Sequence, residues 1–178
     1  MNRIVRVPTK FRQRGFTLME IIVGAIIFIF LLGAVGKLVL SNRDAVTGGA
    51  DTAVIQNARA KLQQCASNYG ADYSWVTTQQ AIHCGAIPAQ SVRGTNAVNS
   101  FNGLLTFAQG ATSATFVITT AGIPGEAQCM NEAAIMYGSW VTVQVNGTSI
   151  PQNSQAGAVA AASTACASGA NTLTFESS

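Results

Sequence analysis

Residues 14–40 read RGFTLMEIIVGAIIFIFLLGAVGKLVL, and from residue 16 onward only Glu20 and Lys37 carry a charge. About 20 apolar residues are enough to cross a bilayer as a helix. Glu20 lies near the start of this run, where a charged side chain costs roughly 2.5–3.5 kcal/mol even on a lenient insertion scale. An ionisable residue at that depth is by default functional and requires a partner. We therefore expect a membrane-inserted helix with Glu20 as a functional site.

The residues that precede this run are basic. Residues 1–15 contain five Lys or Arg and no acid. An ordinary secretory signal has its apolar region before the cleavage site, whereas here the apolar region comes afterwards. A cut after Gly15 would keep the apolar run and expose a new amine on Phe16. Phe16 and Glu20 would stand about 6 Å apart along a helix, so this amine is our candidate partner for Glu20.

The run GFTLME, with Gly15, Phe16 and Glu20 behind a short basic leader, resembles the prepilin signature of type IV pilins and type II secretion pseudopilins. The resemblance implies that a prepilin peptidase cleaves after Gly15 and that Phe16 becomes the N-methylated first residue. It also implies that Glu20 meets the Phe16 amine of a neighbouring subunit. Such a subunit waits in the inner membrane, is handled by an inner-membrane assembly machinery and polymerises with itself into a surface fibre. Without the resemblance, the alternative is a plain single-span anchor.

The expected organisation has four parts: a cleaved leader at 1–15, a transmembrane and filament-core helix at 16–40, its amphipathic continuation at 41–68 and a globular head at 69–178. Residues 43–66 lack proline and are rich in helix formers. Val54, Ala58, Leu62 and Cys65 recur at helical spacing and predict the buried face, with Asp51 elsewhere on the circumference.

Gly33 and Gly36 lie late in the apolar run, where each glycine weakens a helix interior by about 1 kcal/mol relative to alanine. The resemblance implies that pilin subunits unwind locally in this zone when they pack into a filament. The alternative is close packing between membrane helices through small residues.

The charges predict both topology and partners. Lys and Arg beside a span are held on the cytoplasmic side, so the head should emerge in the periplasm, an oxidising space. Without the leader, five basic residues stand against seven acidic ones, a net charge of −2. Beyond Lys61 the only basic side chain is Arg93, so nucleic acid, which needs Lys and Arg to neutralise its phosphates, is not an expected partner.

The four cysteines predict two disulfides in an oxidising space. Metal binding is the runner-up, but no spacing is C-x-x-C and the chain has a single histidine, His83. Of the three possible pairings we favour Cys65–Cys84 and Cys129–Cys166, because both close local loops. Type IVb pilins, which the chain resembles, bracket a C-terminal part of the head with a bond like Cys129–Cys166.

The head reads as α+β. Helices are predicted at residues 77–83, 126–137 and from Ser154 to about 167, and strands at 104–108, 115–120, 140–145, 148–150 and 173–175. Asn146-Gly147 is a strong hairpin turn, and residues 69–109 are otherwise a turn-rich connection. The resemblance implies the type IV pilin fold, in which a long N-terminal helix packs on an antiparallel sheet with disulfides in the head.

Catalytic signatures are missing from the sequence: we find no phosphate loop, no G-x-S-x-G and no H-E-x-x-H. The acids of the head stand singly along the sequence, so paired carboxylates are not expected. We therefore expect neither an enzyme nor a bound cofactor or metal. The resemblance points to the major subunit of a type IVb pilus used for adhesion, cell–cell contact or conjugative mating. The alternatives are a type II secretion pseudopilin and a minor or DNA-uptake pilin.

Overall fold

The computed structural model describes residues 22, 48–68 and 70–178. The chain divides into compact units of residues 1–41 and 42–178, and the elements below belong to the second unit. No helix in the described part of the chain has both the length and the apolar character needed to span a bilayer. The predicted span at 16–40 lies outside the described residues, apart from Ile22.

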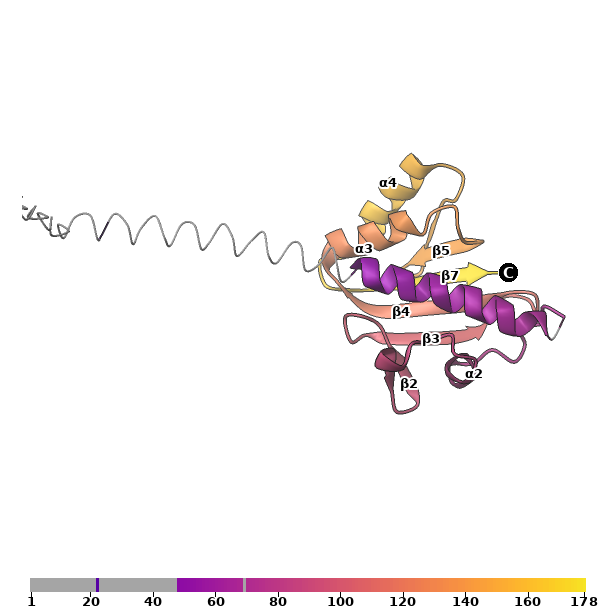
Figure 1. Cartoon of the computed structure of the whole chain (residues 1–178). Helices are drawn as coiled ribbons and strands as arrows, with labels where there is room; N and C mark the ends of the chain where they lie inside the picture. The colour runs from indigo at the N-terminus through magenta and orange to yellow at the C-terminus, as the bar shows by residue number, and fades with distance from the viewer. Residues whose placement is uncertain (1–21, 23–47, 69) are drawn as a thin grey trace, which may run out of the picture. The chain divides into compact units, whose positions relative to one another are not determined.

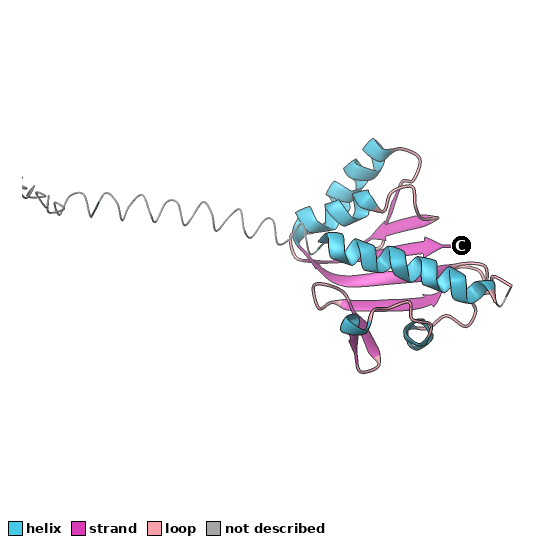
Figure 2. Cartoon of the chain, in the orientation of Figure 1, coloured by secondary structure: helices cyan, strands magenta, loops and turns pink. Residues whose placement is uncertain are grey.

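The second unit is built on one antiparallel sheet whose seven strands run in the order β1-β2-β3-β4-β7-β5-β6 (Figures 1 and 2). The strands are β1 (Val92–Arg93), β2 (Asn96–Val98), β3 (Leu104–Gln109), β4 (Phe116–Pro124), β5 (Thr142–Val145), β6 (Thr148–Ile150) and β7 (Ala170–Ser177). The last strand of the sequence therefore lies inside the sheet, paired with β4 on one side and β5 on the other.

A helix over residues 48–67, here called the spine helix, packs on this sheet (Figure 1). Its buried residues recur every three or four positions, which is the spacing of one helical face. The fully buried ones are Asp51, Ile55, Ala58, Leu62 and Ala66, and Thr52 beside Asp51 is buried as well. This corrects the predicted face at its edges, since Val54 and Cys65 are only half-buried. At the start of the helix, Gln128 of α3 fills the space next to Gly48.

The connection after the spine helix contains more structure than the sequence predicted. The short helix α2 (Thr78–His83) is confirmed, and Thr77 caps it by accepting a hydrogen bond from the Gln80 amide at 3.3 Å. The 3-10 helix η1 (Ala89–Ser91) and the β1–β2 hairpin were not predicted. Two- and three-residue strands are too short to show an alternating pattern, and their pairing depends on β3 beside them.

Strand β4 is longer than predicted because an irregularity lets it continue past Thr120. Its register against β7 shifts between Ala121 and Ile123, where Gly122 has a φ of 75°. A Cβ on Gly103 would lie 1.7 Å from the Ala121 carbonyl oxygen. The β2–β3 turn can therefore approach this point only through a glycine.

Helices α3 (Gly125–Ile135) and α4 (Gln155–Ala165) confirm the two predicted after the sheet begins, and Ser154 caps α4 through the Gly157 amide at 3.1 Å. Strand β5 starts later than predicted. Trp140 packs on Phe175, with ring centroids 5.3 Å apart, and Val141 is exposed, so the chain enters the sheet only at Thr142. The hairpin turn at Asn146-Gly147 is confirmed. The α+β class is likewise confirmed.

Candidate functional site

The residues predicted to act in processing and assembly are Gly15, Phe16 and Glu20, and those predicted to soften the helix are Gly33 and Gly36. All five lie outside the described residues. The functional geometry that can be described is that of the head, where three features stand out: the disulfides, a buried acidic cluster and a groove beside the spine helix.

Both predicted disulfides are present, and each joins two elements that are separate in sequence. Cys65–Cys84 ties the last turn of the spine helix to the end of α2, with a Cα–Cα distance of 6.5 Å. Cys129–Cys166 ties α3 to the end of α4, with a Cα–Cα distance of 5.8 Å. Together they fasten both regions that flank the sheet.

Arg59 anchors the spine helix to the segment between α3 and β5. Its guanidinium lies 5.0 Å from the ring centroid of Trp140 and donates a hydrogen bond to the Ser139 carbonyl. The indole of Trp140 in turn donates to the sulfur of Met136 at 3.3 Å. A cation over an indole contributes about 0.5–2 kcal/mol. The charge of Arg59 is therefore used in contacts within the head that stabilise the fold.

Asp51, on the spine helix, is fully buried. Its carboxylate accepts a hydrogen bond from the Ser100 amide at 3.1 Å and one from the Thr120 hydroxyl at 3.4 Å. Asn99 completes this contact by donating to Thr120 at 2.8 Å. The helix is thus joined through one carboxylate to the β2–β3 turn and to β4. Burial is the main reason that the pKa of Asp51 is raised, and the hydrogen bonds oppose the rise.

Glu132, on α3, is the second buried acid. It is fully buried, its Oε1 accepts a hydrogen bond from Gln128 at 3.2 Å, and its Oε2 has no hydrogen-bond partner among residues 48–68 and 70–178. Burial, followed by the charge of Asp51, raises the pKa of Glu132 to about 8, against a smaller lowering by Gln128. Two buried acids that repel each other retain a proton where isolated ones would not. Glu132 is therefore mainly protonated at neutral pH.

The buried position of Asp51 corrects its predicted placement away from the buried face of the spine helix, and its charge acts on Glu132 of α3. The sequence does contain a pattern that indicates that both acids are buried. Asp51 precedes Ile55 by four residues, and Glu132 follows Cys129 by three and precedes Met136 by four, so each acid is in phase with a buried stripe. The sequence could not predict that Asp51 and Glu132 lie near each other, because this depends on how α3 packs against the spine helix.

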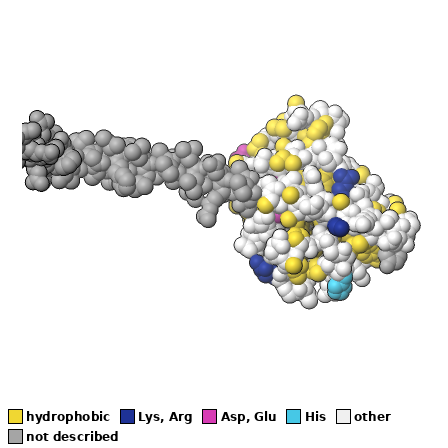
Figure 3. Space-filling view, viewed as in Figure 1, with side chains coloured by type: hydrophobic (Ala, Val, Ile, Leu, Met, Phe, Trp, Pro, Cys, Tyr) yellow, Lys and Arg dark blue, Asp and Glu magenta, His cyan; other side chains and the backbone are white. Residues whose placement is uncertain are grey.

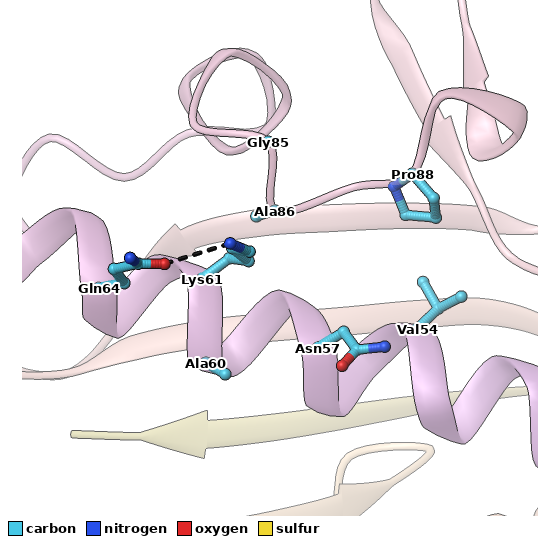
Figure 4. A pocket seen from close by; sticks show the side chains of 8 residues that line it. All are labelled: Val54, Asn57, Ala60, Lys61, Gln64, Gly85, Ala86 and Pro88. Carbon is cyan, nitrogen blue, oxygen red and sulfur yellow. Dashed lines mark hydrogen bonds between the residues drawn. The ribbon is translucent and has the colours of Figure 1, made fainter.

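An open groove of about 480 Å³ separates the spine helix from the segment 85–88 (Figure 4). Figure 4 shows the Lys61 side chain directed from the helix toward this segment, where its amine donates to the Gln64 amide oxygen at 3.2 Å. The walls are otherwise formed by small or apolar residues and neutral amides: Val54, Asn57, Ala60, Gln64, Gly85, Ala86 and Pro88. The groove thus combines a broad, shallow shape with one cation.

A second hollow, of about 430 Å³, lies at the Cys65–Cys84 disulfide and is also lined by Trp75, Gln80 and His83. His83 is exposed there, as the sequence allowed. No group of three His, Cys, Asp or Glu side chains in the described part of the chain could hold a metal ion.

The chain is similar to known proteins both in sequence and in fold. Residues 42–178 match the family PilS, described as "PilS N terminal". No curated protein matches the chain. Among solved structures, the crystal structure of TcpA, a type IV pilin from Vibrio cholerae El Tor biotype, superposes with a TM-score of 0.53 at 14% identity. The match covers 74% of this chain and 99% of that one. At this identity the likeness concerns the fold alone.

Proposed function

Because the chain belongs to the PilS family of type IV pilins and has the type IV pilin fold, we propose that it is the major structural subunit of a type IVb pilus. A type IV pilin is a structural subunit that polymerises with copies of itself. The observation that carries the proposal is the family match over residues 42–178, which spans the whole head and its helix.

The N-terminal sequence supplies the assembly chemistry. A prepilin peptidase removes residues 1–15, and Phe16 becomes the methylated N-terminus. Glu20 of one subunit then faces the Phe16 amine of the next within a core of apolar helices, where low polarity strengthens their attraction. Gly33 and Gly36 allow the helix to adjust as it packs. The motif behind the basic leader supports the cleavage, the methylation and the role of Glu20.

The route of the subunit follows from its charges. The basic leader keeps the N-terminus in the cytoplasm, the apolar run holds the subunit in the inner membrane, and the head folds and oxidises in the periplasm. The inner-membrane assembly machinery then adds it to an extracellular fibre. Two disulfides and a C-terminal strand paired on both sides suit a head exposed on such a fibre, where it would serve adhesion, cell–cell contact or conjugative mating.

Among the alternatives, DNA capture fits the head poorly. The described residues contain three Lys or Arg, and one of them, Arg59, is stacked on Trp140. Lys61 and Arg93 alone would remain to neutralise phosphates. No feature of the described residues of the head specifically favours a type II secretion pseudopilin.

The test is electron microscopy of fibres sheared from cells that express the chain, with mass spectrometry of their main protein. We expect thin fibres composed mainly of this protein, with a mature mass that begins at methylated Phe16. Fibres in which it is a trace component would make it a minor pilin, and a protein that keeps residues 1–15 or never polymerises would refute the proposal.

A further inference from the structure

The few basic residues of the head differ in how they are used. Arg59 lies over Trp140, and the guanidinium of Arg93 donates to the carbonyls of Gln90 and Val92. Lys61 donates only to the neutral amide of Gln64 within the described residues. The charge of Lys61 is therefore not neutralised by a carboxylate in this part of the chain.

Lys61 also lies in the groove rather than on an open surface. Figure 3, which shows the face that carries the spine helix, has separate dark-blue patches and only small magenta areas. Ala60, Gly85 and Ala86 line the groove with small residues, and Val54 and Pro88 give it apolar walls. The fitting occupant is a helix face with one acid and small or apolar side chains.

Helix α3 offers such a face on its outer side. Glu126 in its first turn and Ala127 are exposed, Met130 and Ala134 are half-buried, and Ile135 is 45% exposed. Glu126, Met130 and Ala134 lie four positions apart along one stripe of the helix, with Ala127 beside them, whereas Ile135 lies farther round the circumference. The exposed face of α4 includes Val159, but α4 contains no charged residue. Charge complementarity therefore selects α3.

We propose that in the fibre the groove of one subunit receives the outer face of α3 of a second copy, with Glu126 placed against Lys61. This inference rests on the proposed function and adds an interface between heads to the contact between N-terminal helices. An exposed ion pair contributes little affinity by itself, but it fixes the orientation and register in which two surfaces meet. The pair would recur at each subunit along the fibre.

Zero-length carbodiimide cross-linking of sheared native fibres tests the contact directly, since it joins an amine only to a carboxylate that touches it. Lys61 is the only lysine among the described residues, so its partner can be read by mass spectrometry. We expect a Lys61–Glu126 peptide and a covalent dimer in fibres, and neither in detergent-dispersed subunits. Fibres that give no dimer, or that link Lys61 to Asp72 or Glu176 instead, would overturn the proposal.

Charge reversal provides the second test. We expect Lys61→Glu and Glu126→Lys each to lower fibre yield several-fold, and the double variant to recover most of it. Arg93→Glu is the matched control, because Arg93 is exposed but does not line the groove, and it should leave the yield unchanged. Resistance of each variant's head to protease verifies that it folds. Equal yields for wild type and Lys61→Glu would refute only this interface, whereas absence of wild-type fibres would refute the proposed function.

Discussion

At the scale of single residues, Glu132 is the most consequential side chain in the head. Its folded-state pKa is about 8, against an ordinary value of 4.5. Between these values the folded protein binds more protons than the unfolded chain, so stability falls as pH rises. The contribution of Glu132 is fully present below about pH 4.5 and is lost as pH rises through about 8. Asp51 acts in the same direction, because its pKa is also raised.

We predict that Glu132→Gln removes most of the decline in stability between pH 5 and pH 8, since glutamine stays neutral throughout. The measurement is thermal unfolding of the purified chain in detergent at several pH values, followed by near-ultraviolet circular dichroism. Glu126→Gln is the control, because Glu126 is the exposed acid of the same helix and should leave the slope unchanged. Parallel pH profiles for wild type and Glu132→Gln would show that Glu132 is not a buried proton-binding group.

Two adjacent glycines of the spine helix should respond oppositely to alanine. A Cβ on Gly48 would lie 1.6 Å from Nε2 of Gln128, whereas a Cβ on Gly49 meets nothing within 4 Å. We predict that Gly48→Ala destabilises the head by about 1–3 kcal/mol, because Gln128 must move away from Glu132. Gly49→Ala should stabilise it by about 0.5–1 kcal/mol, because alanine favours a helix. Denaturant unfolding compares the two variants, and a similar effect of both would contradict the packing described here.

At the scale of elements, the disulfides differ in what they protect. Cys65–Cys84 spans 19 residues and Cys129–Cys166 spans 37, for which the loop-entropy relation gives about 3 and about 4 kcal/mol. Cys129 and Cys166 are also buried, whereas Cys65 and Cys84 are half-buried. The disulfide between α3 and α4 thus contributes more to the free energy of unfolding, and it is less accessible to a reductant.

We therefore predict that mild reduction of the native protein opens Cys65–Cys84 first. Alkylation of the freed thiols followed by peptide mass spectrometry would identify the bond at each time point. Replacing Cys129 and Cys166 by serine should lower stability by somewhat more than replacing Cys65 and Cys84. Simultaneous opening of both bonds would mean that reduction proceeds through global unfolding instead of local access.

Elements also show where sequence reasoning succeeds. The Ser154 cap and the Asn146-Gly147 turn were predicted correctly, because each depends on a few neighbouring residues. Thr77 was predicted as part of its helix and instead caps it. Strand β5 was extended too far toward Trp140, because an alternating pattern does not reveal that an aromatic side chain turns away to pack on Phe175.

At the scale of the whole molecule, assembly should depend on Glu20. We predict that Glu20→Ala gives a subunit that is processed and inserted in the membrane but enters fibres poorly, since the amine of Phe16 loses its partner. Western blotting of membranes and of sheared fibres separates these steps. Glu132→Gln is a suitable control, because it changes an acid buried in the head and should leave fibre yield intact. Normal yield from Glu20→Ala would refute the pairing.

The sequence by itself predicted the α+β class, the cysteine pairing and most helices of the head, which the structure confirms. The membrane-entering run and the processing motif, which lie outside the described residues apart from Ile22, stay predictions. These follow from composition, spacing and turn residues, which act over short stretches of chain. Only the tertiary structure placed β7 between β4 and β5, brought Asp51 near Glu132, and opened a groove beside Lys61. Each of these depends on contacts between residues far apart in the chain, and their free energy is decided by which surfaces become buried together.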